Sequence, residues 1–521
     1  MAHSAIVADP VGSGNPSWRA RVTWPSLRSR GNVMSIVEHE FESLLPSGDV
    51  HPYRSGSWRP QTKEWTTTSP RVRGDVPDDF AGIYLRNTEN PLVPAAERYH
   101  PFDGDGMLHS IAFDNGEVQY RNRFVRTKGL AAELEHGGPL WSGLAESPKK
   151  AVREDGWGAR TRMKDASSTD VVVHRGVALS SFYQCGDLYR LDPITLADLG
   201  TESWNGNFPK EGVSAHTKVD VRTGELMFFN YSTSYPFMHY GVVSASGELV
   251  TYIDVPLPGP RLPHDMVFTE RFSIVNDCPL FWDPQLLERG VYANRFYRDM
   301  PMRLGVIPRH GSTNDIRWFE CEPTFVLHWI NAYEDGDEIV IDGYFQSDPA
   351  PSLPPDATVD ERLFRYLDLH AMQSRPYRWR LNLVTGEVKE GPLSDTITEF
   401  GVINNRVAGS RYTTTYSTVP TEGWFTFEGL IRHDVDSGRE ETLRLEPGVF
   451  CSEAVFAPRS NAKSEDDGYV LTYTIDMNAD RSDCLIFDAT RLSDGPIAAV
   501  ELPERISSGT HAWWDDRSPR S

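Results

Sequence analysis

Four histidines that are far apart in the chain stand in similar local settings. Each lies at the start of a strand-like run or inside one, beside small or apolar neighbours. Imidazole is a good ligand for iron, zinc, copper and nickel, so one function that the four could share is to hold a metal ion. For any one of them alone, the alternative is a structural or surface histidine. They are His216 in "GVSAHTKVD", His264 in "RLPHDMVFTE", His328 in "EPTFVLHWINAYED" and His511 in "SSGTHAWW".

The spacing of these histidines excludes a local metal motif. A helical site such as HExxH places its two histidines four residues apart, whereas the interval from His216 to His511 covers more than half of the chain. The ligands would therefore come from separate elements that return to one point. The innermost strands of a β-propeller do this, because every blade directs one strand toward a common axis.

Two glutamates are candidates to hold such histidines in place. A ligand histidine donates its second ring N–H to an acceptor, which fixes the tautomer and the orientation of the ring. Glu399 in "TITEFGVINN" and Glu453 in "FCSEAVFAPR" lie in otherwise apolar, strand-like surroundings. For each glutamate the alternative is an exposed position at the edge of a strand.

The elements that would position these residues are predicted to be β-hairpins. Strand-like runs alternate with turns rich in Asp, Asn, Ser and Gly from about residue 80 to about residue 503. So many hairpins without alternating helices predict an all-β fold, most simply a β-propeller. The repeat is not regular, so the pattern does not fix the number of blades. Examples are "IAFDNGEVQYRNRFV", "KVDVRTGELMFFNY", "VVSASGELVTYIDV", "WRLNLVTGEVKEG", "IRHDVDSGREETLRL" and "LIFDATRLSDGPIAAVEL".

Two segments break the hairpin pattern. Residues 128–165 and 283–300 are predicted to be helix and loop, and we expect them to form a cap over one face of the propeller. No linker divides the rest, which favours a single domain over residues 34–521. Residues 1–33 carry four arginines and one acid, and we expect a disordered extension or a mis-assigned start before Met34.

Composition excludes several classes of function. The chain of 521 residues has a formal net charge of −22, so a nucleic acid would be repelled over most of the surface. Its five cysteines form no CxxC motif, which excludes a zinc-finger or disulfide framework and indicates a reducing cytoplasm. No apolar run is long enough for a transmembrane helix.

With these residues in place, the sequence resembles the carotenoid cleavage oxygenases, a family of non-haem iron(II) dioxygenases that includes lignostilbene- and isoeugenol-cleaving enzymes. The resemblance runs from about residue 75 to the end of the chain. It rests on ordered segments: "GIYLRNTENP", "YHPFDGDGMLHSIAF", "SAHTKVD", "HDMVFTE", "HWINAYEDGD", "EAVFAPR", "DDGYVLTYTID" and "THAWW".

The resemblance implies a seven-bladed propeller with a helical cap, one Fe(2+) on the axis and an apolar substrate tunnel. It implies that His216, His264, His328 and His511 bind the iron, and that Glu399 and Glu453 hold ligand histidines. A third glutamate is common in the family, but here "DASSTDVVV" offers Ser168, Thr169 and Asp170. We expect Asp170 or Ser168 to replace it, or a ligand to be held differently. Ala512 stands where the family has a glycine.

The implied reaction is cleavage of a conjugated C=C bond by O2 to two aldehyde or ketone products. The substrate is expected to be an apolar carotenoid or apocarotenoid. The alternative is a phenolic stilbene or phenylpropene, whose hydroxyl a tyrosine and a lysine engage in that branch of the family. Tyr99 matches the tyrosine. Lys128 follows Thr127 by one residue, and Gly129 occupies the place where the branch has its lysine. A propeller that only binds a lipid is a third hypothesis.

Two further expectations concern the surface and the turns. Polyenes dissolve in membranes, so peripheral contact with a bilayer is expected, with the segment around 286–297 as the candidate. The sequence does not give the oligomeric state. The acidic "DGDG" at Asp103–Gly106 lacks the spacing of a calcium loop and is interpreted as a tight turn.

Overall fold

Antiparallel hairpins make up most of the protein, as the sequence predicts. The computed structural model describes residues 34–159 and 162–516, so the prediction about residues 1–33 lies outside the described part. The hairpin of β11 (Lys218–Asp220) and β12 (Glu225–Tyr231) is typical: Gly224, with φ +73°, occupies the turn, where a left-handed backbone favours glycine.

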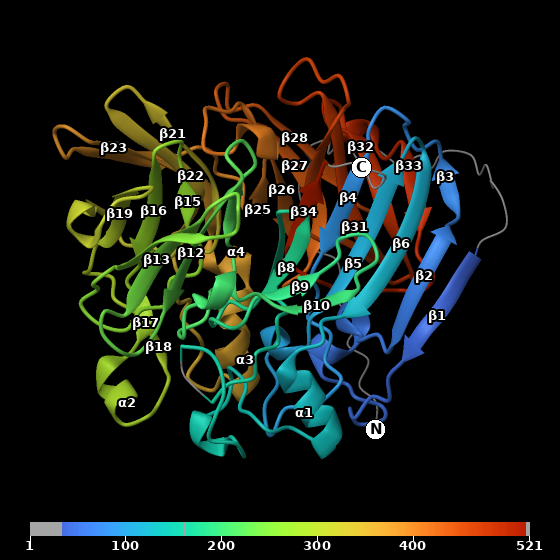
Figure 1. Cartoon of the computed structure of the whole chain (residues 1–521), viewed down its shortest axis with the longest axis horizontal. Helices are drawn as coiled ribbons and strands as arrows, with labels where there is room; N and C mark the ends of the chain where they lie inside the picture. The colour runs from blue at the N-terminus through green and yellow to red at the C-terminus, as the bar shows by residue number, and fades with distance from the viewer. Residues whose placement is uncertain (1–33, 160–161, 517–521) are drawn as a thin grey trace, which may run out of the picture.

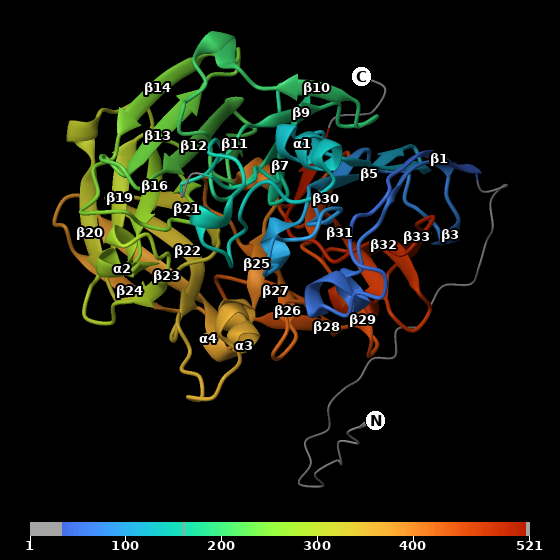
Figure 2. The same ribbon diagram turned by 90° about the horizontal axis from the view of Figure 1, so that it is seen from below.

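The hairpins are arranged in seven blades, which confirms the predicted all-β propeller (Figure 1, Figure 2). The first blade contains β4 (Gly82–Arg86), β5 (Met107–Asp114) and β6 (Glu117–Phe124), with β2 (Lys63–Ser69) and β1 (Met34–Glu40) added outside. The second contains β7 (Asp170–His174), β8 (Val177–Ser181), β9 (Tyr189–Leu191) and β10 (Asp198–Thr201). The third adds β13 (Met238–Val243) and β14 (Leu249–Asp254) to β11 and β12.

The remaining blades follow the same order along the chain. The fourth contains β15 (Val267–Phe268), β16 (Phe272–Asp277), β19 (Met302–Pro308) and β20 (Arg317–Cys321). The fifth contains β21 (Trp329–Asp335), β22 (Glu338–Gln346), β23 (Ser374–Asn382) and β24 (Val388–Pro392). The sixth contains β25 (Glu399–Val402), β26 (Thr414–Pro420), β27 (Phe427–Asp434) and β28 (Glu440–Arg444). The seventh contains β30 (Val455–Pro458), β31 (Gly468–Asp476), β32 (Arg481–Asp488) and β33 (Ala498–Glu501), and β29 (Val449–Cys451) pairs with both β27 and β31.

Each end of the described chain contributes one strand to a blade that is formed mainly by the other end. β34 (Ala512–Asp515) pairs with β4 and becomes the innermost strand of the first blade. β3 (Val72–Gly74) pairs with β33 and becomes the outermost strand of the seventh blade. Trp514 is buried against Phe80 and Phe113, so the C-terminal strand is held by packing as well as by strand pairing.

Helices gather on one side of the blades, toward the bottom of Figure 1. As predicted, residues 128–165 contain a helix, α1 (Lys128–His136). Residues 283–300 contain α2 (Pro284–Glu288) but also β18 (Asn294–Phe296), which pairs with β17 (Leu280–Trp282), so this segment is partly a hairpin. A third helical segment, with α3 (Val359–Phe364) and α4 (Leu369–Met372), was not predicted.

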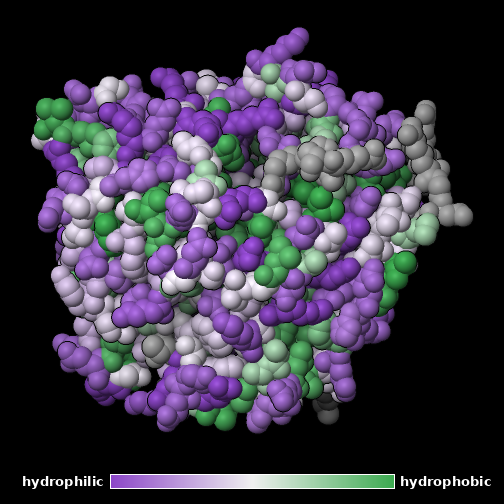
Figure 3. All heavy atoms as spheres, viewed as in Figure 1, coloured by the Kyte–Doolittle hydropathy of each residue, from purple (hydrophilic) through white to green (hydrophobic). Residues whose placement is uncertain are grey.

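The surface in Figure 3 is mainly polar, with scattered apolar side chains. Large apolar residues are instead buried in clusters between neighbouring blades and under the cap. Within residues 34–159 and 162–516, no helix has the length and apolar character that crossing a bilayer requires.

Candidate metal centre

The four histidines meet at the beginning of four innermost strands. His328 and His511 directly precede β21 and β34, and His216 and His264 precede β11 and β15 by two and three residues. The Nε2 atoms of His216 and His264 lie 3.1 Å apart. All four rings offer one ligand atom within 4.8 Å of the others. Since each strand belongs to a different blade, the propeller itself brings the four imidazoles together.

The other three innermost strands supply acids. Asp170 and Glu399 are the first residues of β7 and β25, and Glu453 lies two residues before β30. The seven blades therefore contribute four histidines and three carboxylates to one centre. The acid oxygens lie against Nδ1 of three rings: Asp170 Oδ2 to His216 at 2.9 Å, Glu399 Oε2 to His328 at 2.7 Å, and Glu453 Oε1 to His511 at 3.3 Å.

This arrangement leaves Nε2 of each acid-bound ring for a metal. A carboxylate that accepts the Nδ1–H bond places the proton on Nδ1 and the free lone pair on Nε2. The Nε2 atom of His328 is buried and has no hydrogen-bond partner among the described residues. Such an orphaned buried nitrogen is costly unless a ligand satisfies it, so the donor set fits a divalent transition metal.

Asp170 occupies the place of the third acid. The "DASSTDVVV" segment offers Ser168, Thr169 and Asp170, and only Asp170 contacts the ring of His216. The hydroxyl of Ser168 is buried and has no hydrogen-bond partner within the described part of the chain, and that of Thr169 accepts the backbone N–H of Tyr183. Ala512, the other departure from the family pattern, donates its backbone N–H to Glu453 Oε2 at 2.6 Å, so the side chain at this position does not interfere with the acid.

Burial sets the charge of the imidazoles. It holds the pKa of His216 and His328 well below the usual value and lowers the pKa of His264 to about 3. Burial also lowers the pKa of His511, but Glu453, Asp170 and Glu89 outweigh it, and the net shift is upward. Three rings are thus neutral in the metal-free protein, the state in which imidazole binds a metal.

Aromatic rings lead from the histidines toward the cap. Phe400 lies 4.5 Å from the ring of His328 and 4.9 Å from that of His511, measured between centroids. Phe425 packs against Phe400 and, on its other side, stacks on Trp58. Tyr183, which contacts the ring of His264, completes this wall. The cap side of the centre is therefore apolar and aromatic.

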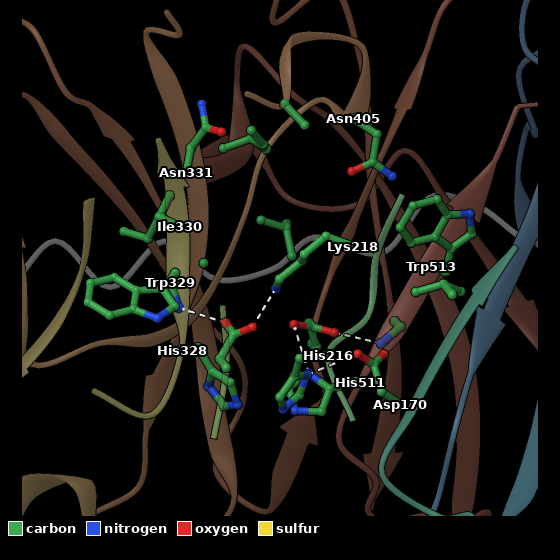
Figure 4. Close-up of a pocket in the computed structure, with 18 of the residues that line it drawn as sticks. Asp170, His216, Lys218, His328, Trp329, Ile330, Asn331, Asn405, His511 and Trp513 are labelled. Atoms are coloured by element: carbon green, nitrogen blue, oxygen red, sulfur yellow. Dashed lines mark hydrogen bonds and ion pairs between the residues drawn. The ribbon is translucent and has the colours of Figure 1, made fainter. Parts of the chain in front are cut away.

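A cavity of about 150 Å³ lies along the propeller axis beyond the histidines. Figure 4 shows His216, His328 and His511 at one end, Lys218 in the middle, and Asn331 and Asn405 at the other end. Sequence reasoning missed Lys218 and Asp265, although both stand within two residues of a candidate ligand.

Tyr99 and Lys128 do not form a pair of free polar groups in the structure, because each one has a partner in the protein. Lys128 begins α1, and its Nζ lies 2.8 Å from Asp187 with 60% of the side chain exposed. Tyr99 is buried in a hydrophobic cluster with Tyr53, Trp58 and Leu367, where its hydroxyl donates to the backbone oxygen of Pro101 at 3.2 Å. The phenolic role of Lys128 thus has no geometric support.

A different lysine occupies the space beside Gly129. A Cβ atom added to Gly129 would lie 3.1 Å from Cγ of Lys164. The Lys164 ammonium is held between Asp105 at 2.5 Å and Glu133 at 2.8 Å. Lys164 and Tyr99 line the same small cavity of about 30 Å³. No sequence signal pointed to this contact, because Lys164 lies in an irregular segment outside the matching motifs.

The acids of Asp103–Gly106 bind groups of the protein. The Asp103 carboxylate accepts the backbone N–H of Leu144 at 3.0 Å. The Asp105 carboxylate accepts the backbone N–H of Leu92 at 3.1 Å and pairs with Lys164. These contacts agree with the interpretation as a turn.

Comparison with known proteins assigns the family. Residues 58–516 match the family model described as retinal pigment epithelial membrane protein. A carotenoid 9,10(9',10')-cleavage dioxygenase of Phaseolus vulgaris is 29% identical over 92% of this chain and 91% of its own length. A lignostilbene-alpha,beta-dioxygenase of Sphingomonas paucimobilis is 27% identical over 89% of this chain and 97% of its own. The structure of a point variant of the apocarotenoid oxygenase of Synechocystis is similar to this one with a TM-score of 0.77 and 23% identity, covering 88% of this chain and 98% of its own.

The propeller carries a four-histidine centre that could hold a metal ion, and the relatives that share its length are dioxygenases, so fold and site define an oxygenase. The chain belongs to the retinal pigment epithelial membrane protein family, whose relatives named above are carotenoid and lignostilbene dioxygenases.

Proposed function

We propose that the protein is an iron(II)-dependent dioxygenase that cleaves a conjugated C=C bond of a carotenoid or apocarotenoid. The observation that carries this proposal is the convergence of His216, His264, His328 and His511, three of them bound to buried acids. Four neutral imidazoles suit a divalent transition metal and leave it positively charged. A bound ferrous ion would supply the activation of O2.

The residues of the chain would bind, orient and exclude water. The aromatic wall formed by Phe400, Phe425, Trp58 and Tyr183 suits the flat, apolar surface of a polyene. Asp170, Glu399 and Glu453 would keep three rings in one tautomer and one orientation. Because Trp58, Phe400 and Phe425 of this wall are buried, a polyene held against them would be shielded from solvent at the cleaved bond.

A reconstitution experiment with a matched control tests the proposal. The metal-free protein is loaded anaerobically with Fe(2+), and the bound iron is measured before and after exposure to ¹⁸O₂ with apocarotenals, carotenes and stilbenes. We expect about one iron per chain and two carbonyl products, with the cleaved bond identified by product masses. His264→Ala should lose iron and activity. His433→Ala, which removes a buried histidine outside the centre, should keep both. Iron-loaded protein that binds polyenes without forming products would contradict the proposal.

A phenolic stilbene or phenylpropene is the second candidate, and one observation favours it. Lys164 and Tyr99 line the same cavity, so an ammonium and a phenol stand near each other although Lys128 is at the surface. Lys164→Met should lower the rate on a 4-hydroxystilbene much more than the rate on an apocarotenal if the phenolic substrate is the physiological one. Lys128→Met is the control and should change neither rate. Equal effects of Lys164→Met on both substrates would remove this candidate.

The predicted cytoplasmic location and contact with a membrane surface are part of the same proposal. A polyene enters from a bilayer, so a transient contact on the cap side would serve delivery. In the 286–297 segment Val291 is exposed, but the charged residues Glu288, Arg289 and Arg295 of the same segment are exposed as well. Vesicle flotation with and without anionic lipid tests this contact.

A further inference from the structure

The carboxylate of Asp265 connects three of the four histidine-bearing segments. It follows His264 directly in the chain, and the residue is 2% exposed. Its Oδ1 atom lies 2.7 Å from Nζ of Lys218, which stands two residues after His216. Its Oδ2 atom accepts the backbone N–H of Trp329 at 2.9 Å, and Trp329 follows His328 directly. One side chain therefore bridges the third, fourth and fifth blades beside the metal centre.

Asp265 is itself fixed within its own blade. Its Oδ1 atom also accepts the backbone N–H of Met266 at 2.7 Å. Its backbone oxygen accepts a hydrogen bond from Asn276 of β16 at 2.7 Å. The carboxylate thus has a defined position from which it can hold the neighbouring segments, rather than being carried along by them.

The bridge through Asp265 lies at the one candidate ligand histidine whose ring is not held by an acid of the described chain. Asp170, Glu399 and Glu453 contact the rings of His216, His328 and His511, whereas no carboxylate of residues 34–159 and 162–516 is hydrogen-bonded to the ring of His264. Instead, the residue after His264 is tied to the segments of its two neighbours. Small displacements of supporting groups change metal affinity strongly, because ligand orientation depends on them.

We propose that Asp265 is a positioning residue of the metal centre, which sets the place of His264 relative to His216 and His328 through Lys218 and the Trp329 backbone. This inference rests on the metal centre under "Proposed function" and adds a role for two residues that contact no ligand atom. An ion pair that only stabilised the fold would not need to connect the residues next to three ligands.

Cobalt(II) is the probe, because its visible absorption reports coordination geometry without any turnover. Affinity is measured by competition with a chelator, and the unfolding temperature is measured in parallel. Asp265→Asn removes the charge that holds Lys218, and Lys218→Met removes the ammonium but keeps most of the stem. We expect each to weaken cobalt binding about 10-fold, the lower end for groups that support ligands, and to change the spectrum. Lys218→Arg, which keeps a cation, should restore both.

Asp483→Asn is the matched control. Asp483 has a 2% exposed side chain, as Asp265 has, and pairs with Arg73 at 2.6 Å between β32 and β3. It should lower the unfolding temperature without changing cobalt affinity or the spectrum. If Asp265→Asn does not fold, Lys218→Met decides the question. Normal affinity and spectrum in the folded Asp265 and Lys218 variants would overturn the inference. A wild-type protein that binds no cobalt would overturn the metal centre and this inference together.

Discussion

Glu399 Oε2 lies 2.7 Å from Nδ1 of His328, although the two residues belong to neighbouring blades. Asp170 with His216 and Glu453 with His511 repeat this relationship across two other blade boundaries. The centre is therefore held by contacts between blades, and the relative position of the blades determines the position of the rings.

Removing the charge of Glu399 should weaken metal binding with little effect on folding. Glu399→Gln keeps the shape of the side chain but loses the charged acceptor, so the affinity for Fe(2+) or Co(2+) should fall about 10- to 100-fold. Titration with a competing chelator measures this change. Glu440→Gln is a close control, because Glu440 binds the buried His433 at 2.6 Å away from the centre. An equal loss in both variants would show that the effect is not specific to the metal centre.

Substitutions of Asp170 and Ser168 test which of the two residues replaces the third acid. Asp170→Asn should lower metal affinity, because it removes the only charged acceptor on the ring of His216 that the structure shows. Ser168→Ala should leave affinity unchanged, because the hydroxyl of Ser168 has no partner. Metal content after gel filtration at limiting iron compares the two. A metal loss in Ser168→Ala alone would reverse the assignment.

Two truncations test the role of the last strand. Ending the chain at Gly509 removes His511 and β34, so it should abolish metal binding and lower the unfolding temperature by many degrees. Ending the chain at Asp516 should be nearly harmless, because it retains the pair of Arg406 with Asp516 and the buried Asp515. Iron analysis measures the bound metal of both truncated proteins, and thermal unfolding measures their stability. Iron retained after the longer truncation would exclude His511 as a ligand.

The raised pKa of Glu89 predicts that the free energy of unfolding of the metal-free protein depends on pH. Burial raises the pKa of Glu89 to about 8, and its Oε2 atom has no partner, while Oε1 accepts from Thr510. Between its unfolded pKa and about 8 the folded protein holds a proton that the unfolded chain has lost. The contribution of Glu89 to the free energy of unfolding is therefore fully present below its unfolded pKa. As the pH rises from there to about 8, this contribution falls by about 1.4 kcal/mol per pH unit.

Urea unfolding at pH 5.5, 6.5 and 7.5 measures this effect. Glu89→Gln cannot titrate, so its stability should decline less steeply than that of the wild type and should exceed it at pH 7.5. Parallel curves for the two proteins would show that Glu89 does not change its protonation on folding.

The fold was predictable because its information is local. Each hairpin carries its own turn residues, so the all-β architecture follows from short segments such as 218–231. The four histidines could be grouped only by their strand-like settings, the propeller hypothesis and the ordered family segments, since no local spacing connects them. The helices at 359–372 were missed because they are short and their capping box, from Thr358 to Glu361, lies in a proline-rich loop.

Contacts between distant segments were the part that the sequence could not show. Lys164 takes the interior place beside Gly129, and Asp265 reaches Lys218 and Trp329, only after the blades have been arranged in a ring. Lys128 lies one residue before the place where the family branch has its lysine. In the structure Lys128 is at the surface, and the space beside Gly129 is taken by Lys164.

The exchange of strands between the two ends has a consequence for biosynthesis. Until β34 emerges from the ribosome, β4 is an open strand edge, and the set of four imidazoles is incomplete. Pairing of such distant segments is slow, and open edges invite association with other chains. The nascent protein therefore depends on β34 both to complete the four-histidine centre and to end the period in which it is prone to aggregate.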